Sequence, residues 1–419
     1  MSFISLGLQT ALAAAAARLG YTGPTAIQQA AIAPILRGED VLATARTGSG
    51  KTAAFVLPLL QRWQAAPRGE RPALHTLVLV PTRELAMQVG AVFRALSEGL
   101  PQAPKLVLAY GGVSINPQMM ALRGWADIVV ATPGRLLDLL AHNALRLDAL
   151  HTLVLDEADR LLEQGFADEL ARILALLPAQ RQNLLFSATM APTVERLAGE
   201  LLHEPCRIDI ASEEPLAIKE RAIAVDAARR TALLVELLRQ QSRPQVLVFV
   251  ASQRDCERVA AKLGKAGLAA AAWHGDLSQG RRSQVLADFK AGRIQLLIAT
   301  DVAARGIDIA DLPLVVNYDL PRSTADYTHR IGRTGRAGQQ GEAISLVSAD
   351  SEMHFRLIEK RLGKRLRREQ LTGFEPSDVA VPSLHDPQGN GGIKGKRKSK
   401  KDKLREAAAQ AGAPEAAKE

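Results

Sequence analysis

The sequence predicts an α/β fold made of two tandem, doubly wound parallel-sheet domains. Short runs rich in Val, Leu and Ile recur along the chain, each bounded by turn residues and followed by a helix-like segment. Strands that are apolar on both faces are typical of parallel sheets covered by helices on both sides. The chain has 419 residues, more than one domain of ordinary size needs, and the pattern begins again near residue 221.

The apolar runs locate the expected strands in order. In the first half they lie at 40–45, 75–81, 105–110, 127–133, 151–157 and 183–189, and in the second half at 245–251, 268–275, 294–301, 312–319 and 341–348. Residues 211–220 combine clustered acids with a proline, which is typical of a linker. We therefore expect an N-terminal segment at 1–29, a first domain at 30–210, the linker at 211–220, a second domain at 221–365 and a tail at 366–419.

The composition excludes several classes of protein. Cys206 and Cys256 form no CxxC motif or Cys/His cluster, so neither a disulfide framework nor a structural zinc site is expected, and a reducing, cytoplasmic location fits. No apolar stretch reaches the roughly 18 residues that a membrane helix needs, so a membrane partner is not expected. Residues 6–17 are apolar, but no Lys or Arg precedes them, which favours a helix over a signal peptide.

The positive charge is concentrated near the C-terminus. The net charge is +9, and residues 360–405 hold 14 Lys and Arg against five acids, so the remainder is about neutral. A run this basic buries too little apolar surface to fold, which predicts a disordered arm, and such an arm can bind the phosphates of a nucleic acid. A solubilising tail without a specific partner explains the charge equally well at this point.

A phosphate-binding loop follows the first strand. Glycines let the backbone curl so that its N–H groups face an anion at a helix N-terminus, and the segment here is Ala45-Arg46-Thr47-Gly48-Ser49-Gly50-Lys51-Thr52. Lys51 at the start of the next helix opposes the helix dipole unless an anion also lies there. Thr52 offers a hydroxyl to Mg²⁺. The alternative is a Gly-rich turn without a ligand.

Acids and hydroxyls follow two later strands. Asp156, Glu157 and Asp159 crowd like charges at a sheet edge, which a divalent cation or positive partners would offset. With a phosphate loop in the same domain, Asp156 becomes the candidate Mg²⁺ ligand through water, and Glu157 the candidate base that orients an attacking water. A single Asp could merely cap a helix, and Ser187 and Thr189 alone indicate a satisfied turn.

Taken together, these residues resemble the DEAD-box RNA helicases of superfamily 2, which have RecA-like domains. The resemblance covers residues 1 to about 365. It rests on Phe3, Gly20-Tyr21-Thr22-Gly23-Pro24-Thr25-Ala26-Ile27-Gln28, the phosphate loop, Pro81-Thr82-Arg83-Glu84-Leu85-Ala86, Gly111-Gly112, Thr132-Pro133-Gly134-Arg135, Asp156-Glu157-Ala158-Asp159, Ser187-Ala188-Thr189, Val248-Phe249-Val250, Gln279 with Arg282, Ala299-Thr300-Asp301, Arg305-Gly306-Ile307-Asp308 and His329-Arg330-Ile331-Gly332-Arg333-Thr334-Gly335-Arg336. The N-terminal stretch and the basic extension look most like the short bacterial RhlE-type branch.

The resemblance implies an ATPase whose nucleotide site is shared by the two domains. Tyr21 would stack on adenine and Gln28 would face its edge, although an ordinary exposed helix residue is the alternative for Gln28. Arg333 and Arg336, three apart, share a face of a helical turn and would act as arginine fingers on the γ-phosphate; a basic face paired with acids is the alternative. Asp308 would contact the ribose. The family couples its ATP and RNA sites through residues that correspond here to Asp159, Ser187, Thr189 and His329.

The same resemblance places RNA contacts on both halves, with little reading of base sequence. They are Pro81, Thr82, Arg83, Gly111, Gly112, Thr132, Gly134, Arg135, Arg282, Thr300 and Asp301. The expected function is ATP-dependent, Mg²⁺-dependent unwinding of short RNA duplexes. An RNA clamp timed by ATP is the second hypothesis, motivated by the basic tail, and a DNA motor of the same superfamily is the third. Ribosomal precursors and RNA-degradation complexes are the kinds of further partner that the family suggests.

Overall fold

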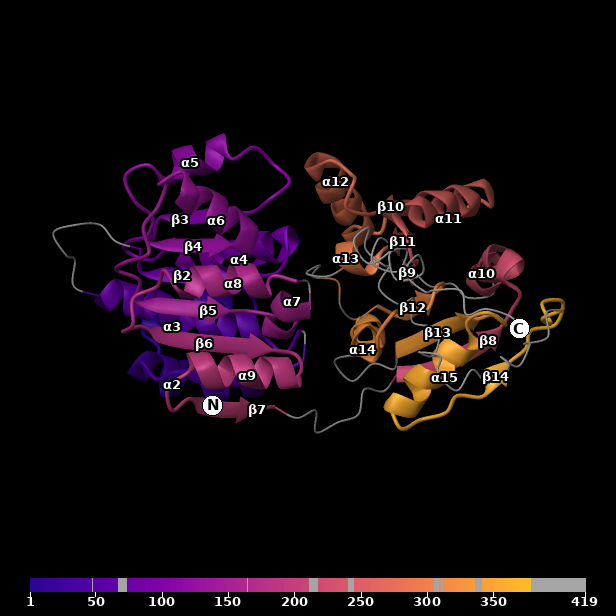
Figure 1. The fold of residues 1–419 in the computed structure, drawn as a ribbon, viewed down its shortest axis with the longest axis horizontal. Helices are drawn as coiled ribbons and strands as arrows, with labels where there is room; N and C mark the ends of the chain where they lie inside the picture. Colours follow the sequence, from indigo (N-terminus) through magenta and orange to yellow (C-terminus); the bar gives the residue numbers. More distant parts are fainter. Residues whose placement is uncertain are drawn as a thin grey trace, which may run out of the picture.

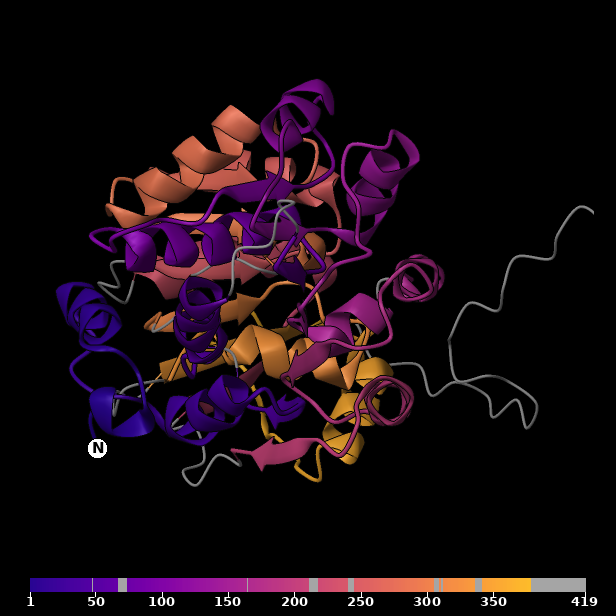
Figure 2. The same ribbon diagram turned by 90° about the vertical axis from the view of Figure 1, so that its left-hand side faces the viewer.

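The structure is a computed structural model. It describes residues 1–46, 48–66, 74–163, 165–210, 218–239, 245–304, 309, 312–335 and 341–377. Two α/β domains lie side by side along the longest axis (Figure 1), and a quarter turn brings the first domain in front of the second (Figure 2). The α/β class and the tandem arrangement predicted from the apolar runs are confirmed.

The first domain is built on a seven-stranded sheet in the order β3-β4-β2-β5-β6-β1-β7, and every strand pairing in it is parallel. Its strands are β1 (Val41–Thr44), β2 (Thr76–Leu79), β3 (Leu106–Ala109), β4 (Ile128–Ala131), β5 (Thr152–Leu155), β6 (Gln182–Ser187) and β7 (Cys206–Asp209). In the centre, Leu77 of β2 lies opposite Val129 of β4 and Leu153 of β5.

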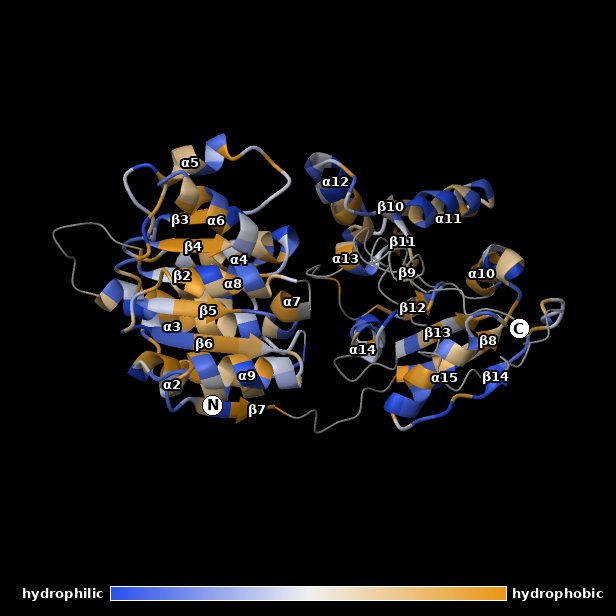
Figure 3. Cartoon of the chain, viewed as in Figure 1, coloured by the Kyte–Doolittle hydropathy of each residue, from blue (hydrophilic) through white to orange (hydrophobic). Residues whose placement is uncertain are grey.

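Helices cover both faces of this sheet. Side chains alternate along each strand, so Val78 enters one apolar core while Leu77 and Leu79 enter the other. Figure 3 shows the resulting apolar strands between helices with hydrophilic outer faces. The helices are η1 (Ile4–Leu6), α1 (Thr10–Arg18), α2 (Ala26–Arg37), α3 (Lys51–Ala65), α4 (Arg83–Ser97), α5 (Asn116–Leu122), α6 (Pro133–Ala141), α7 (Ala158–Glu163), α8 (Ala167–Leu174) and α9 (Pro192–Leu201).

The second domain repeats this plan with the order β10-β11-β9-β12-β13-β8-β14, again parallel throughout. Its strands are β8 (Ile218–Ala224), β9 (Val246–Phe249), β10 (Ala270–Trp273), β11 (Leu296–Ala299), β12 (Leu314–Asn317), β13 (Gly341–Val347) and β14 (Arg368–Glu369). The helices are η2 (Ala227–Arg229), α10 (Arg230–Arg239), α11 (Gln253–Lys265), α12 (Gln279–Lys290), α13 (Asp301–Ala304), α14 (Thr324–Ile331) and α15 (Glu352–Arg361).

Two of the predicted domain boundaries need correction. Residues 218–220 were expected in the linker but belong to β8, which pairs with β13 along its whole length. The second domain also continues beyond residue 365, because β14 extends the sheet and Leu371 and Phe374 pack on its core. The strands β7, β8 and β14 contain charged residues, so they could not be recognised as apolar runs. Residues 211–217 and 378–419, which hold the rest of the linker and most of the tail, lie outside the described residues.

A helix was expected over residues 6–17; α1 covers Thr10–Arg18, and residues 7–9 are not helical. None of the helices in the described part of the chain is both long enough and apolar enough to cross a membrane. Cys256 is buried in the core of the second domain, where desolvation raises the pKa of its thiol to about 12. It is therefore a packing residue, as expected.

Candidate nucleotide and RNA site

The strand order divides the carboxyl edge of the first sheet into two regions. The phosphate loop follows β1, the acidic segment follows β5, and Ser187 ends β6, and these three strands are neighbours in the order β5-β6-β1. The segments predicted to contact RNA follow β2, β3 and β4, which are neighbours at the other side of the sheet. Because the carboxyl ends of parallel strands meet at one edge, each predicted set of residues is brought together.

The phosphate loop adopts the curled backbone that the sequence predicts. Gly48 and Gly50 have φ values of 77° and 96°, and Gly50 is the N-cap of α3. The Ala45 N–H donates to the Ser187 carbonyl at 3.1 Å, which ties the loop to β6. Lys51 is buried, and its ammonium group donates to the Ala45 carbonyl inside the loop. Arg46 and Thr52 are half-buried, and Thr47 lies outside the described residues.

Residues at the start of α2 form hydrogen bonds to the phosphate loop. Thr25 Oγ1 donates to the Ser49 carbonyl at 2.8 Å, and Gln28 Nε2 donates to the Gly50 carbonyl at 3.2 Å. Gln28 Oε1 also accepts from the Thr25 N–H at 3.0 Å, so the side chain caps α2 and is buried. A Cβ at position 50 would lie 2.6 Å from Gln28 Nε2, so only glycine fits this contact.

These bonds use half of the Gln28 amide. An amide group has two donor hydrogens and two acceptor lone pairs, so one of each is left for an adenine edge. The predicted adenine contact therefore stays a prediction that the geometry permits. Tyr21, predicted to stack on the base, is half-buried and packs against the first core.

The acidic segment after β5 is strongly perturbed. Burial, followed by the nearby Glu157 charge, raises the pKa of Asp156 to about 7. Burial also raises the pKa of Glu157, while the Lys51 and Arg333 charges act to lower it. Glu157 has a φ of 52°, an unusual value for a residue other than glycine, and its N–H donates to Asp156 Oδ1 at 2.9 Å. Strain and crowded charge at one place are typical of a functional site.

Asp159 connects this segment to β6. Its Oδ2 accepts from Thr189 Oγ1 at 3.0 Å, and the Ser187 hydroxyl donates to the Thr189 carbonyl at 2.7 Å. Three of the four residues predicted to couple the two ligand sites therefore form one hydrogen-bonded group. The alternative for Ser187 and Thr189 was a turn that satisfies its own polar groups. That turn is present as well, since the hydrogen bonds that a coupling role would use also satisfy these hydroxyls.

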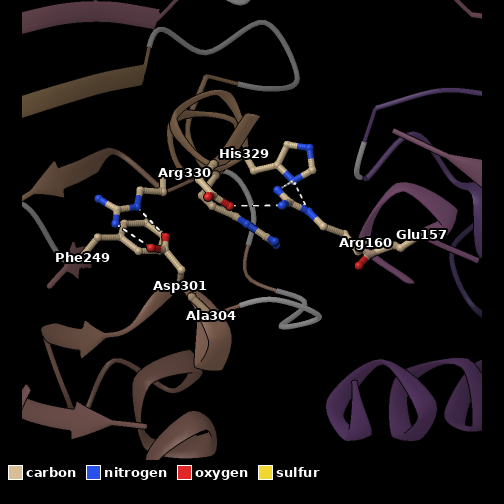
Figure 4. Close-up of a pocket in the computed structure, with 9 residues that line it drawn as sticks. Glu157, Arg160, Phe249, Asp301, Ala304, His329 and Arg330 are labelled. Atoms are coloured by element: carbon tan, nitrogen blue, oxygen red, sulfur yellow. Dashed lines mark hydrogen bonds and ion pairs between the residues drawn. The ribbon is translucent and has the colours of Figure 1, made fainter. Parts of the chain in front are cut away.

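The remaining predicted coupling residue, His329, lines a cavity between the two domains (Figure 4). The Nε of Arg160 donates to His329 Nδ1 at 3.1 Å, and its Nη1 donates to Asp326 Oδ1 at 3.1 Å. Burial, and next the Arg160 charge, lower the pKa of His329 to about 3, so the ring is neutral and can accept. The cavity is lined by Glu157, Arg160, Phe249, Asp301, Ala304, Asp326, His329, Arg330 and Arg333.

In the second domain, Arg330 binds the side chains that lie beside the cavity. Arg330 bonds both carboxylate oxygens of Asp301, at 2.6 and 2.7 Å, and lies 4.8 Å over the ring of Phe249. This uses the Asp301 side chain, whose predicted RNA contact stays a prediction. Arg333 lines the cavity together with Glu157, as the predicted role of arginine finger requires. Arg336 and Asp308 lie outside the described residues.

Three functional side chains were missed by the sequence analysis. Arg160 and Arg330 each directly follow a predicted site residue, Asp159 and His329. A charged residue beside a motif is usually solvated, so neither could be selected from the sequence. Glu84 lies in the Pro81–Ala86 motif and pairs with Arg282 of α12 at 3.0 Å, a contact between the two domains.

Among the predicted RNA residues, Arg83 and Gly112 of the first domain contact each other. Thr82 is the N-cap of α4, and its hydroxyl accepts from the Leu85 N–H at 3.3 Å. The Arg83 guanidinium lies against Gly112, and Arg135 Nη2 donates to the Val113 carbonyl at 2.9 Å. The remaining members of the set lie at the carboxyl ends of β2, β3, β4 and β11 or in the first turn of α6, and these are Pro81, Gly111, Thr132, Gly134 and Thr300.

This edge fits a nucleoside triphosphate with Mg²⁺. The described residues contain no group of three or more His, Cys, Asp or Glu side chains that could hold a metal ion. A divalent cation beside Asp156 and Thr52 would therefore take further oxygen ligands from phosphates and water, as Mg²⁺ usually does. The Ser49 hydroxyl in the phosphate loop is buried and has no hydrogen-bond partner within the described residues, which is expected where a ligand oxygen is missing.

Comparison with known proteins identifies the family. The model described as DEAD/DEAH box helicase matches residues 25–197, and that described as Helicase conserved C-terminal domain matches residues 229–338. ATP-dependent RNA helicase CshA of Listeria monocytogenes is 39% identical over 87% of this chain and 69% of its own. DEAD-box ATP-dependent RNA helicase 28 of Oryza sativa is 40% identical over 87% of this chain, which spans only 46% of that longer protein.

A solved structure shares both the fold and the arrangement of domains. S. cerevisiae Dbp5 bound to RNA and ADP BeF3 superposes with a TM-score of 0.77 and 32% identity, over 88% of this chain and 95% of that one. These matches agree with the two parallel seven-stranded sheets, with the phosphate loop after β1 and with the acidic segment after β5. The chain therefore belongs to the DEAD-box family of ATP-dependent RNA helicases.

Proposed function

We propose that the protein hydrolyses ATP, with Mg²⁺, to unwind short RNA duplexes and remodel RNA–protein complexes with little sequence specificity. One observation carries this proposal: a single cavity is lined by Glu157 of the first domain and by His329 and Arg333 of the second. A ligand that contacts all three binds only the closed arrangement, and so favours it over the open one.

Each of these residues has a separate role in ATP hydrolysis. Lys51 and the N–H groups of the phosphate loop bind the β- and γ-phosphates, and Arg333 approaches the γ-phosphate from the second domain. Glu157 orients the attacking water. Asp156 and Thr52 would hold Mg²⁺, which supplies charge stabilisation to the transferring phosphoryl group. When the γ-phosphate leaves, Arg333 loses its anionic partner and the closed arrangement loses stability.

The protein binds RNA through the sugar-phosphate backbone. The predicted contacts are glycines, hydroxyls, helix N-termini and arginines, which suit sugar and phosphate better than base edges. Aromatic residues make up only 4% of the chain, so base stacking contributes little specificity. Dbp5, whose structure contains RNA, supports RNA as the nucleic acid.

The test is the substitution Glu157→Gln. The amide keeps the size of the side chain but cannot act as a base, so the variant should bind ATP and RNA and hydrolyse ATP on the order of a hundredfold more slowly. Glu195→Gln is a matched control, because Glu195 is exposed on α9, away from the cleft. ATPase rates and duplex unwinding are measured with each protein. Equal rates for Glu157→Gln and the parent protein would contradict the proposed role.

A second experiment tests the nucleic acid. ATPase stimulation is compared with single-stranded RNA and DNA of the same length and sequence. Stimulation by RNA alone is the expected result. Equal stimulation by DNA would favour a DNA motor, and no stimulation by either would contradict the proposed coupling.

We also propose two finer assignments, the branch of the family and the location in the cell. We place the protein in the RhlE-type bacterial branch, supported by the N-terminal stretch and the basic run at 394–405. We also propose a cytoplasmic location, since both cysteines are thiols, as is usual in a reducing compartment. Crosslinking of cellular RNA to the Glu157→Gln protein would show whether ribosomal precursors or degradation substrates are its targets.

A further inference from the structure

A large hollow lies on the first domain, at the edge of the sheet opposite the ligand sites. Its volume is about 980 Å³. It is lined by residues that precede β2, β4 and β5 and by the ends of α5 and α6. The phosphate loop, the acidic segment and the predicted RNA contacts all follow strands of this sheet, so none of them takes part in this groove. A molecule bound there would leave the ATP and RNA sites open.

The groove has an apolar floor and an exposed apolar rim. Its floor includes Leu74, Leu122 and Val129, which are buried in the second core of the domain or at its border. At the rim Met120 is 54% exposed and Trp125 is 47% exposed. Large apolar side chains that face water beside an apolar hollow are typical of a surface that binds another protein. Methionine side chains in particular adapt to different partners.

The charges around the groove are mainly positive. The guanidinium groups of Arg123 and Arg146 belong to the lining, and the Lys105 ammonium donates to the Arg123 carbonyl at 2.8 Å. Among the described residues of the lining, the only carboxylate is that of Asp148, which pairs with Arg146 at 3.0 Å. Both members of this pair are largely exposed, so the pair is weak and Arg146 can exchange partners. The lining therefore holds two cations and one carboxylate, and the Lys105 ammonium lies beside Trp125 at its rim.

Two parts of this chain outside the described residues do not match the groove. Residues 67–73, which directly precede Leu74, read PRGERPA and contain no large apolar side chain. Residues 394–405 carry eight Lys and Arg, so they would be repelled by the cationic rim. The charge and the apolar floor together call for an acidic ligand with apolar side chains.

We propose that this groove docks an acidic amphipathic helix of a partner protein. Apolar side chains of the helix, spaced at i, i+3, i+4 and i+7, enter the hollow between Met120 and Trp125. Its carboxylates meet Arg123, Arg146 and Lys105 at the rim. RNA fits this surface less well, because the Lys105 ammonium already lies 5.4 Å over the Trp125 ring, where a base would stack, and the floor offers phosphates no partner.

The experiment uses a fluorescein-labelled synthetic peptide of about 18 residues with Leu at the helical apolar positions and Glu at the others. A second peptide carries Lys in place of every Glu. Each is titrated with the full-length protein, and anisotropy gives the dissociation constant. We expect saturable binding of the Glu peptide, at least tenfold tighter than that of the Lys peptide, and weaker at high salt.

Two substitutions locate the binding surface. Met120→Glu should weaken binding of the Glu peptide by about tenfold or more, because it places an anion at the apolar rim. Leu176→Glu is the matched control, since Leu176 is also 54% exposed on the first domain but does not line the groove, and its effect should stay within about twofold. Arg123→Glu, at an exposed position outside the core, should weaken the Glu peptide and tighten the Lys peptide. If Met120→Glu fails to fold, Arg123→Glu provides the test in its place.

Several outcomes would overturn the proposal. Equal affinity for the two peptides, or no binding of the Glu peptide, would remove the claimed complementarity. An unchanged affinity in both Met120→Glu and Arg123→Glu would place the binding elsewhere. Competition by an unstructured RNA oligonucleotide, lost in Met120→Glu, would make the groove a nucleic-acid site instead.

Discussion

The guanidinium of Arg160 crosses the cleft to Asp326, with Nη1 3.1 Å from Oδ1. Arg160 comes from the first domain and Asp326 from the second, and Arg160 is only 2% exposed. A buried charge is costly unless it is paired, so this cation is stable in place only while its partner lies opposite. The pair therefore contributes to the closed arrangement, and its removal should weaken closure rather than nucleotide binding itself.

A double-mutant cycle tests this pair. Arg160→Lys keeps the charge but cannot reach Asp326 and His329 with one planar group, so RNA-stimulated kcat should fall by tenfold or more, with little change in nucleotide affinity without RNA. Asp326→Asn should have a similar effect. The two changes should be coupled by about 1 kcal/mol or more in the activation free energy of RNA-stimulated hydrolysis. Arg172→Lys, at an exposed position on α8, should leave kcat unchanged. Additive effects of Arg160→Lys and Asp326→Asn would contradict the pairing.

Closure should weaken in acid because of His329. The pKa of its ring is about 3 in the closed structure, lowered by burial, Arg160 and Arg333 against the opposing charges of Asp159 and Asp326. Once the domains separate and the ring meets water, its pKa returns to about 6.5. Between these values the open form takes up a proton that the closed form does not, so closure loses up to about 1.4 kcal/mol for each pH unit below 6.5.

Energy transfer between dyes on the two domains, measured with RNA and a non-hydrolysable ATP analogue from pH 7.5 to 5.5, checks this direction. In His329→Gln the dependence should be smaller. A closed fraction that is constant over this range in the parent protein would show that the ring does not titrate on opening.

Gly50→Ala should abolish nucleotide binding. The residue has a φ of 96°, and a Cβ would lie 2.6 Å from Gln28 Nε2, so the loop and the segment that holds it would both have to move. Gly199→Ala in α9 is the opposite case, because no atom lies within 4 Å of its Cβ position. That change should stabilise the helix by about 0.5–1 kcal/mol. Fluorescent nucleotide titrations and thermal unfolding of both variants separate the two effects, and full nucleotide affinity in Gly50→Ala would contradict the contact.

Arg330→Lys should destabilise the second domain by about 3 kcal/mol. Its side chain is 3% exposed and binds both oxygens of Asp301, and it also donates to Asn317 Oδ1 at 3.1 Å. A lysine cannot reproduce this set of bonds, so it leaves the half-buried Asp301 carboxylate and the buried Asn317 amide oxygen with fewer hydrogen bonds. Arg293→Lys is the control, because that arginine is 62% exposed and pairs with Asp288 on the surface, where about 0.5 kcal/mol is expected. Urea unfolding gives both values, and equal losses would contradict the argument.

Removal of residues 378–419 tests the basic tail. The cut should follow Ser377, since the Ser377 hydroxyl donates to Asp226 at 2.8 Å and Phe374 packs on the second domain. If the tail binds RNA, the truncated protein should show a higher KM for long RNA and a weaker dependence of that KM on salt, with the ATPase on short RNA unchanged. An unchanged KM would mean that the tail is only a solvated extension.

The sequence predicted the residues whose chemistry depends on a fixed local pattern. Buried strands, the phosphate loop and the acids after β5 each have a spacing that few other structures need, so they could be recognised in isolation. Arg160, Glu84 and Arg330 could not, because their roles come from partners more than a hundred residues away or from burial that only the assembled sheets create. Strands β7, β8 and β14 were missed for a related reason, since short segments with charged residues at or next to the edge of a sheet look like loop residues.

The Glu84–Arg282 and Arg160–Asp326 pairs join the same two domains, one beside the predicted RNA contacts and the other beside the acidic segment. The coupling free energy by which ATP favours RNA binding through this closure equals that by which RNA favours ATP binding, because binding linkage is reciprocal. The factor by which ATP tightens RNA should therefore equal the factor by which RNA tightens ATP. Any substitution that loosens either pair should lower both factors together.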